Sequence, residues 1–166
     1  MLIRQSNAAD FPHILAIINE AAQAYRGIIP NDRWHEPYMP ADELTREIEN
    51  GVAFWVAEDD GDVLGVMALQ DRDDVTLVRH AYVSPTHQRK GVGVQLLRHI
   101  EALSTKPILI GTWADASWAI AFYRRNGFAL VPSSETGRLL RKYWSIPERQ
   151  IETSVVLANR QWIEPG

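Results

Sequence analysis

The residues whose types and spacing most clearly suit ligand binding form a short segment rich in glycine and basic side chains, Gln88-Arg89-Lys90-Gly91-Val92-Gly93. Apolar residues follow at helical spacing, so the segment opens an amphipathic helix. The first amides of a helix have no intrahelical acceptor and carry partial positive charge, and glycines let an anion approach the backbone closely. The two cationic side chains add donors for the same anion. The segment therefore predicts a binding site for a phosphate or pyrophosphate group.

Two common nucleotide-binding motifs do not match this segment. A P-loop requires Gly-Lys-Ser or Gly-Lys-Thr, and the chain contains neither string. The dinucleotide fingerprint requires a third glycine three residues after Gly93, where the chain has Leu96. The sequence therefore favours neither a P-loop nucleotide site nor a dinucleotide site.

A second segment makes a family resemblance specific. It reads Ala119-Ile120-Ala121-Phe122-Tyr123-Arg124-Arg125-Asn126-Gly127-Phe128 and follows a strand-like run at 107–112. In order and spacing, the two segments resemble the acetyl-CoA binding signature of the GNAT N-acetyltransferase superfamily. The resemblance is strong over residues 75–128 and looser before them. Members often carry Asn where this chain has Ala116, so a polar contact is either missing here or made by Ser117.

The resemblance implies a fold and a co-substrate. The expected fold is α/β, a single GNAT-like domain over residues 1–166, with a mixed central sheet of about six to seven strands and helices on both faces. The expected co-substrate is acetyl-CoA, entering where the strands at 75–83 and 108–112 splay apart. The residues implied to bind it are Ala81, Tyr82 and Val83 for the pantetheine arm, Gln88, Arg89, Lys90, Gly91, Val92, Gly93 and Val94 for the pyrophosphate, and Ala119 and Phe122 from the second segment.

Tyr123 is the predicted catalytic residue. Acetyl transfer to an amine needs a proton donor for the departing thiolate, and the matching tyrosine of the family lies near the thioester sulfur. A thiol with a pKa of about 8.5 leaves readily once a phenol donates a hydrogen bond to it. Outside this motif, a tyrosine next to Phe122 would more often be a core residue. The resemblance also implies that the backbone amide of Ala81 stabilises the oxyanion.

The sequence does not identify a general base. Where the family places a carboxylate or histidine on the fourth strand, the chain has Leu77 and Arg79. Strand alternation predicts that His80 points to the opposite face from Arg79 and packs against neighbours. A water-relayed base remains open, with Glu58, Asp71 and Asp74 as candidates.

Three side chains are predicted to contact the acceptor. Tyr25 and Trp34 lie with Tyr38 in an irregular, proline-rich stretch at 25–40 and either form an aromatic wall or pack that loop down. Arg79 either binds a carboxylate or phosphate of the acceptor or is an ordinary surface arginine.

Composition limits the chemistry. The 166 residues include no cysteine, which excludes disulfides, thiolate metal sites and a cysteine nucleophile, so transfer should be direct and no metal is expected. The net charge is −4 and the basic residues are mostly dispersed, so nucleic acid is not an expected partner. The first residues lack a basic region followed by a long apolar stretch, and no run reaches membrane-spanning length. We therefore expect no membrane contact and a cytoplasmic location. The oligomeric state stays open, and the candidate is a homodimer with the Trp144 region and the last strand as contact surfaces.

Residue patterns predict the remaining helices and strands along the chain. Helix caps, turn residues and apolar periodicity support each assignment. The expected elements are a strand at 2–5, a helix capped by Ser6 or Asn7 and stopped by Gly27, a helix starting at Pro40 with Leu44 and Ile48 inward and ending at Gly51, a hairpin of strands 53–58 and 63–70 turning at Asp60-Gly61, a short strand ending at Val131, a helix at 134–144 capped by Ser133 and a strand at 151–158.

These observations predict an acetyl-CoA-dependent N-acetyltransferase that transfers acetyl directly to the primary amine of a small molecule or peptide. One alternative is a non-catalytic acyl-CoA-binding sensor or partner module, which Ala116 and the missing strand base favour and Tyr123 disfavours. Another is a transferase for longer acyl groups, which the size of the cavity beyond the thioester would decide.

Overall fold

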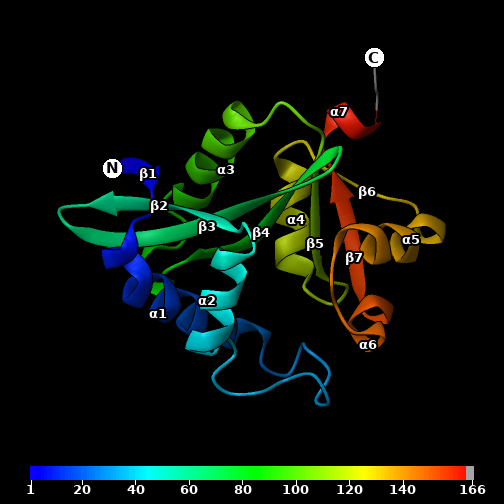
Figure 1. Cartoon of the computed structure of the whole chain (residues 1–166), viewed down its shortest axis with the longest axis horizontal. Helices are drawn as coiled ribbons and strands as arrows, with labels where there is room; N and C mark the ends of the chain where they lie inside the picture. Colours follow the sequence, from blue (N-terminus) through cyan, green and yellow to red (C-terminus); the bar gives the residue numbers. More distant parts are fainter. Residues whose placement is uncertain (164–166) are drawn as a thin grey trace.

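The fold is built on one mixed seven-stranded sheet with the strand order β1-β2-β3-β4-β5-β7-β6 (Figure 1). The structure is a computed structural model that describes residues 1–163. Within those residues β4 and β5 pair in parallel, and the other neighbouring strands pair antiparallel. The strands are β1 (Leu2–Gln5), β2 (Ala53–Asp59), β3 (Asp62–Arg72), β4 (Val75–Val83), β5 (Ile108–Trp113), β6 (Ala129–Leu130) and β7 (Ser154–Ala158). The predicted α/β class and mixed sheet are confirmed.

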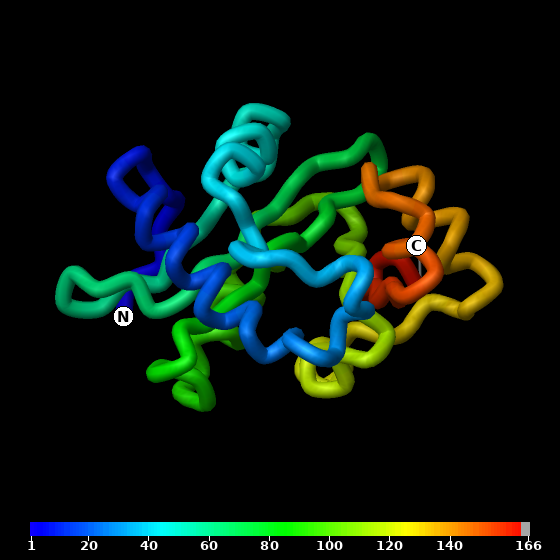
Figure 2. The backbone as a smooth tube through the Cα atoms, turned by 90° about the horizontal axis from the view of Figure 1, so that it is seen from below, coloured from blue at the N-terminus to red at the C-terminus, as the bar shows by residue number. Residues whose placement is uncertain are grey.

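Helices cover both faces of this sheet. The α-helices are α1 (Phe11–Ala21), α2 (Ala41–Glu49), α3 (Val92–Leu103), α4 (Ser117–Arg125), α5 (Ser133–Tyr143), α6 (Glu148–Glu152) and α7 (Arg160–Ile163). Helices α3 and α4 share one core cluster with the sheet, whereas α1 and α2 share another with β2 and β3, and α5 packs on β4, β5 and β7. Figure 2 shows the N-terminal helices and the orange C-terminal helices over opposite ends of the molecule.

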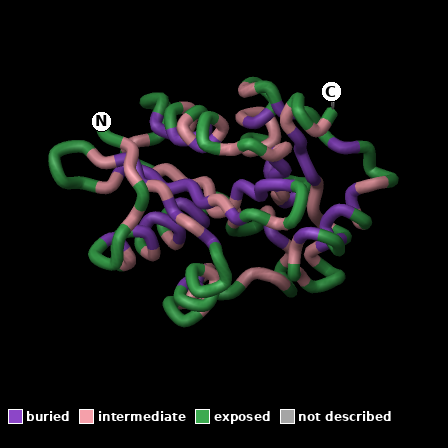
Figure 3. The backbone as a smooth tube through the Cα atoms, turned by 45° about the horizontal axis from the view of Figure 1, so that its top comes forward, coloured by how far each residue is buried: buried purple, intermediate pink, exposed green. Residues whose placement is uncertain are grey.

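Strand alternation decides which side chains enter which core. Along β2, Phe54 and Val56 are buried with α1 and α2, whereas Trp55 and Ala57 pack on the α3 side. This period of two is what a strand buried on both faces requires. Figure 3 shows the result as buried backbone through the sheet, with exposed turns around it.

The parallel pairing between β4 and β5 is short, and the sheet opens where this pairing ends. The paired residues are Thr76 with Ile108, Leu77 with Leu109 and Val78 with Ile110. Beyond Val78, β4 continues to Val83 without a pairing to β5, so its backbone presents a free edge there. The expected divergence of these two strands is therefore present.

A β-bulge in β4 overturns one prediction. Ala68 of β3 pairs with Arg79 and Val66 pairs with Tyr82, so one residue of β3 faces two residues of β4. His80 has a φ of 50°, in the left-handed region. The expectation that His80 points away from the face of Arg79 is wrong, because the extra residue returns His80 to the face of Arg79.

Other expectations were partly wrong at the ends of elements. The strand predicted at 151–158 covers Ser154–Ala158, and helix α6 occupies the residues before it. Strand β7 lies between β5 and β6, and β6 pairs only with its last two residues, Leu157 and Ala158. Ile48 was expected to face inward but is 40% exposed, because α2 buries a narrow stripe around Leu44.

Two local predictions hold. Asn7 accepts a hydrogen bond from the Ala9 amide and forms a capping box with Asp10, which starts the segment leading into α1. Asp60 and Gly61 both have positive φ in the turn between β2 and β3, as a tight hairpin turn requires.

Candidate functional site

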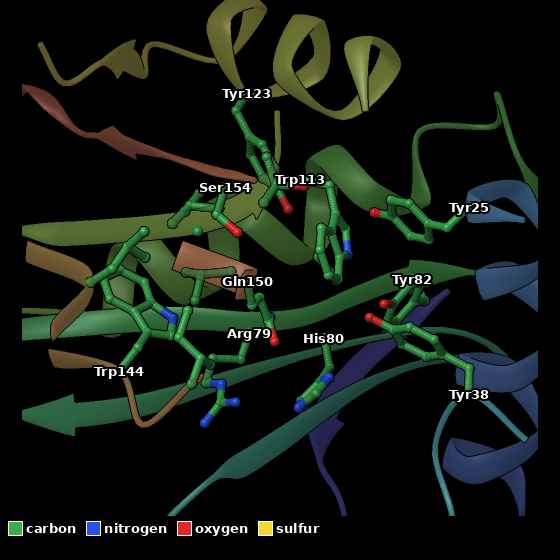
Figure 4. Close-up of a pocket in the computed structure, with 17 residues that line it drawn as sticks. Tyr25, Tyr38, Arg79, His80, Tyr82, Trp113, Tyr123, Trp144, Gln150 and Ser154 are labelled. Carbon is green, nitrogen blue, oxygen red and sulfur yellow. The ribbon is translucent and has the colours of Figure 1, made fainter. Parts of the chain in front are cut away.

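The divergence of β4 and β5 opens into a cavity of about 130 Å³, here called the inner cavity. Figure 4 shows side chains from the sheet, from α4 and from the segments around α1 and α6 converging on it. Its lining residues are Tyr25, Tyr38, Val78, Arg79, His80, Ala81, Tyr82, Ile110, Gly111, Thr112, Trp113, Tyr123, Leu140, Trp144, Ile146, Gln150 and Ser154.

Tyr123 reaches the inner cavity from α4. Its side chain points from the helix toward the space between Ser154 and Trp113 (Figure 4). The residue is 7% exposed, and burial followed by the nearby Tyr25 raises the pKa of its phenol. Its hydroxyl forms no hydrogen bond with any group of residues 1–163. The group is therefore a neutral phenol at pH 7 whose proton is available to a bound molecule.

Aromatic side chains close a second side of the cavity. Tyr25 stacks on Tyr38 with ring centroids 6.4 Å apart and meets Tyr82 edge-on at 6.3 Å. Burial and the neighbouring Tyr38 raise the pKa of Tyr25 to about 12, and burial is also the main cause that raises the pKa of Tyr38 and Tyr82. Trp118 lies against Tyr25 at 5.3 Å. This wall is thus uncharged at neutral pH.

The glycine-rich segment begins α3, as predicted, and its two glycines have different structural roles. Gly91 is the N-cap residue with a φ of 80°, a conformation that favours glycine. A Cβ on Gly93 would lie 3.3 Å from Cζ of Phe122, so Gly93 permits close packing of α3 on α4. The first recorded bond of the helix runs from the Gln95 amide to the Gly91 carbonyl, at 3.1 Å. The amides of the preceding turn therefore have no intrahelical acceptor.

A charged cluster lies where the bulge displaces β4. His80 Nε2 donates a hydrogen bond of 2.6 Å to Oε1 of Glu47 on α2, and Nη2 of Arg79 lies 3.3 Å from the same oxygen. Although burial raises the pKa of Glu47, the hydrogen bond from His80 and the nearby Arg79 guanidinium outweigh it, and the pKa falls below its ordinary range. The Glu47 carboxylate is thus ionised at neutral pH. Because Nε2 donates to it, Nδ1 is the His80 atom that can accept a proton.

The cluster separates the inner cavity from a wider one of about 700 Å³, here called the outer cavity. Six residues line both cavities: Tyr38, Arg79, His80, Trp113, Ile146 and Gln150. The remaining lining residues of the outer cavity are Arg33, His35, Met39, Glu43, Glu47, Asn50, Val52, Gln70, Arg72, Ser145 and Pro147. His80 therefore stands between a phenolic chamber and a charged one.

Two of the three predicted acceptor residues line a cavity, and the third does not. Tyr25 lines the inner cavity and Arg79 lines both, whereas Trp34 lines neither and packs behind Tyr38 at 5.8 Å. Nη1 of Arg79 donates to Gln70 Oε1 at 3.1 Å, so this guanidinium is already held by protein partners.

The predicted co-substrate residues surround the opening. Ala81 and Tyr82 line the inner cavity, and Val83 lies one residue further along the free edge of β4. Phe122 and Ala119 pack against the α3 core, and Gln88 donates to the Val83 carbonyl at 3.3 Å. The cradle from Arg89 to Val94 continues from that edge.

The three acidic candidates for a water-relayed base lie elsewhere. Glu58 pairs with Arg4, Asp71 accepts from Thr76, and Asp74 accepts from Tyr143 at 2.6 Å. None of them lines either cavity.

Several residues of the site were not found from the sequence. Glu47 lies on the polar side of an amphipathic helix, where a glutamate normally gives no signal of function. The bulge that brings His80 to it has no marker in a strand without glycine. Ala116 is fully buried among Ile29 and Trp113, which explains why an apolar residue suits this position.

Two further observations concern metals and membranes. In the part of the chain from residue 1 to 163, no group of three or more His, Cys, Asp or Glu side chains is arranged to hold a metal ion. Over the same residues, no helix is long and apolar enough to cross a membrane.

The fold and the site combine a sheet that splays beside the glycine-rich start of α3 with a buried phenol at the divergence. A family model described as "Acetyltransferase (GNAT) domain" matches residues 50–130, which include the strand, the cradle and the Tyr123 segment. The chain belongs to the GNAT acetyltransferase superfamily, and it is therefore an enzyme of the acyltransferase class.

Solved structures agree with this fold. A PaiA N-acetyltransferase from Thermoplasma acidophilum, in complex with coenzyme A, is 19% identical with a TM-score of 0.72, over 95% of this chain and 97% of that one. A GNAT-family acetyltransferase from Staphylococcus aureus is 15% identical with a TM-score of 0.71, over 95% and 97% of the two chains. A ribosomal-protein-alanine N-acetyltransferase from Brucella melitensis is 22% identical with a TM-score of 0.67, over 96% and 99%.

Proposed function

We propose that this protein is an acetyl-CoA-dependent N-acetyltransferase that moves the acetyl group directly to a primary amine. The observation that carries the proposal is the placement of the neutral Tyr123 phenol in the cavity where β4 and β5 diverge. From that cavity the free edge of β4 runs to Val83, and the chain continues to the first turn of α3, whose amides have no intrahelical acceptor. A free strand edge and a helix start suit a ligand with an extended amide-bearing arm and a pyrophosphate.

The residues around the cavity have separable roles in the proposed reaction. The amine nitrogen forms a bond to the thioester carbonyl carbon while the carbon–sulfur bond breaks. The Ala81 amide stabilises the carbonyl oxygen, and Tyr123 donates a hydrogen bond to the leaving sulfur. Because the raised pKa of Tyr123 exceeds that of a thiol, the phenol stabilises the thiolate chiefly by hydrogen bonding.

His80 is the proposed general base. It lies at the boundary of the two cavities, and the hydrogen bond between its Nε2 and the ionised Glu47 fixes the orientation of the ring. An amine is protonated at neutral pH, so a base at the acceptor side is required before nitrogen can attack. Glu47 thus acts as a positioning residue for His80.

The cavity volume supports a short acyl group. An apolar cavity of about 150 Å³ holds one benzene molecule, which is a useful comparison for the 130 Å³ inner cavity. That space suits an acetyl group beside the reacting amine, whereas a long acyl chain would need more room than the aromatic wall leaves.

A thermal-shift titration with acetyl-CoA, coenzyme A, longer acyl-CoAs and NAD, followed by thiol release against a panel of amines, tests the proposal. A ligand that binds the native state raises the melting temperature by mass action. We expect stabilisation by acetyl-CoA and amine-dependent release of thiol. Stabilisation without release on any amine would favour a non-catalytic acyl-CoA sensor, and no stabilisation would contradict acetyl-CoA binding.

A further inference from the structure

The outer cavity contains two arginines whose buried nitrogens lack partners. Nε of Arg33 and Nε of Arg72 are both inaccessible to solvent and make no hydrogen bond. Neither guanidinium forms a salt bridge within residues 1–163. Buried polar groups are nearly always satisfied in folded proteins, so two unsatisfied arginines in one cavity require an explanation.

The two arginines come from different elements and meet at the same space. Arg72 is the last residue of β3, on the same face as Gln70, and Arg33 belongs to the irregular segment before α2. Both line the outer cavity together with Arg79. Figure 4 shows Arg79 and His80 on the side of the inner cavity away from Tyr123, and both also line the outer cavity.

The charge around the cavity is unevenly compensated. Glu47 is engaged by His80 and Arg79, so its carboxylate is not free to neutralise the other arginines. Three arginines and two glutamates line the cavity, an excess of one positive charge, and within residues 1–163 neither Arg33 nor Arg72 forms an ion pair with either glutamate. Arginine binds carboxylate and phosphate groups with paired, charge-assisted hydrogen bonds.

We infer that the acceptor is an amine that also carries an anionic group, a carboxylate or a phosphate, which Arg33 and Arg72 bind in the outer cavity. The inference rests on the proposed N-acetyltransferase function and specifies its substrate class. The anion is held at the charged end while the amine reaches past Tyr38 to His80, since these two residues line both cavities. Arg79 orients the base through Glu47 and is not the primary anion ligand.

Matched pairs of acceptors test this assignment. Amino acids are compared with their carboxamides, and phosphoethanolamine with ethanolamine, so that each pair differs in its anionic group. We expect the anionic member to have the lower KM, and the better pair to identify carboxylate or phosphate. Arg33→Gln and Arg72→Gln should each raise the KM of that anionic acceptor about tenfold or more, with the KM of its neutral partner changed less than about twofold.

Arg46→Gln is the matched control, because Arg46 is an exposed arginine of α2 paired with Asp42 and lines neither cavity. It should change neither KM. Because Nε of Arg72 has no partner, Arg72→Gln should not lower the melting temperature of the ligand-free protein. Should that variant fold poorly, Arg72→Lys keeps the charge without the bidentate geometry and should raise the same KM.

The outcomes separate this inference from the proposed function. If neutral and anionic amines are acetylated equally and neither arginine variant changes the KM of an acceptor, the proposed anion site is contradicted. The proposed N-acetyltransferase function would still stand. If no amine is acetylated, the anion site can still be tested through the melting temperature. The melting temperature in inorganic phosphate and in succinate is compared with that in chloride at equal ionic strength. A rise in the wild type and Arg46→Gln that is lost in the double variant Arg33→Gln/Arg72→Gln supports the anion site, and equal shifts in all three overturn it.

Discussion

The inner and outer cavities are separated by one strand bulge, yet their chemistry is opposite. The inner cavity is bordered by the phenols of Tyr25, Tyr38, Tyr82 and Tyr123, which burial keeps neutral. The outer cavity is lined by arginines and glutamates. A neutral chamber suits a thioester and a departing thiolate that needs a hydrogen-bond donor, whereas a charged chamber suits an acceptor that must be selected from water.

The bulge explains how the two chambers stay connected. Regular alternation would place Arg79 and His80 on opposite faces, and the extra residue places both beside Glu47. The imidazole thereby reaches the boundary between the chambers. A single irregular residue in β4 thus lies between the proposed co-substrate chamber and the proposed acceptor chamber.

Removing the phenol of the inner chamber should have the largest effect. Tyr123→Phe is expected to lower kcat by roughly 100-fold or more, because removing one hydrogen-bond donor to a developing negative charge commonly costs about 10²–10³-fold. Acetyl-CoA affinity, measured by calorimetry, should be nearly unchanged. Tyr143→Phe is the control, since its hydroxyl bonds Asp74 away from both cavities. A loss of melting temperature with an unaltered kcat in Tyr123→Phe would sink the proposed role.

Disrupting the boundary should have the next largest effect. His80→Gln and Glu47→Gln are each expected to lower kcat/KM by roughly 10- to 100-fold without changing acetyl-CoA affinity. Because Glu47 acts through His80, the double variant should be no slower than His80→Gln alone. Multiplicative losses would show that the two residues act independently and would contradict the positioning role.

The same carboxylate predicts a pH effect on stability. The folded state lowers the pKa of Glu47 below its ordinary value of 4.5, so its stabilising contribution is present above that value and is lost as pH falls through the folded pKa. Urea unfolding across this acid range should show a smaller loss of stability in Glu47→Gln than in the wild type. At neutral pH the variant should be less stable by about 1.5–3 kcal/mol, the usual contribution of a hydrogen bond to a charged group. Identical acid profiles would contradict this assignment.

The smallest effect is expected for a second phenol in the same chamber. Tyr25→Phe keeps the ring that stacks on Tyr38 and removes its hydroxyl. Since Tyr25 is proposed to form the wall, kcat should stay within about twofold of the wild type, whereas loss of the hydrogen-bond donor to the thiolate costs about 10²-fold or more. A loss equal to that of Tyr123→Phe would mean that the two phenols cannot be assigned separate roles.

The sequence predicted the inner chamber better than the outer one, for physical reasons. Gly91, Val92 to Leu103 and the Tyr123 segment follow local rules of helix start and period, so they were read from neighbouring residues. The outer chamber depends on Arg33, Glu47 and Arg72, which are far apart in the chain and resemble ordinary surface charges. Their convergence comes from the loop before α2 and from the end of β3, and no local pattern encodes it.

The missed bulge shows a second limit. Register along a strand follows alternation, and alternation predicted the wrong face for His80 because no glycine or proline marked the irregularity. The wrong extent of the last strand has a similar cause, since Ile151 is apolar enough for either a strand or the short α6.

The central claim is that both substrates occupy adjoining chambers at once and that acetyl moves directly between them. Initial velocities measured over a grid of acetyl-CoA and amine concentrations test it most directly. Double-reciprocal lines that intersect are predicted, because a ternary complex must form before transfer and the chain has no cysteine to carry the acetyl group. Parallel lines, together with an acetylated protein isolated in the absence of amine, would contradict it.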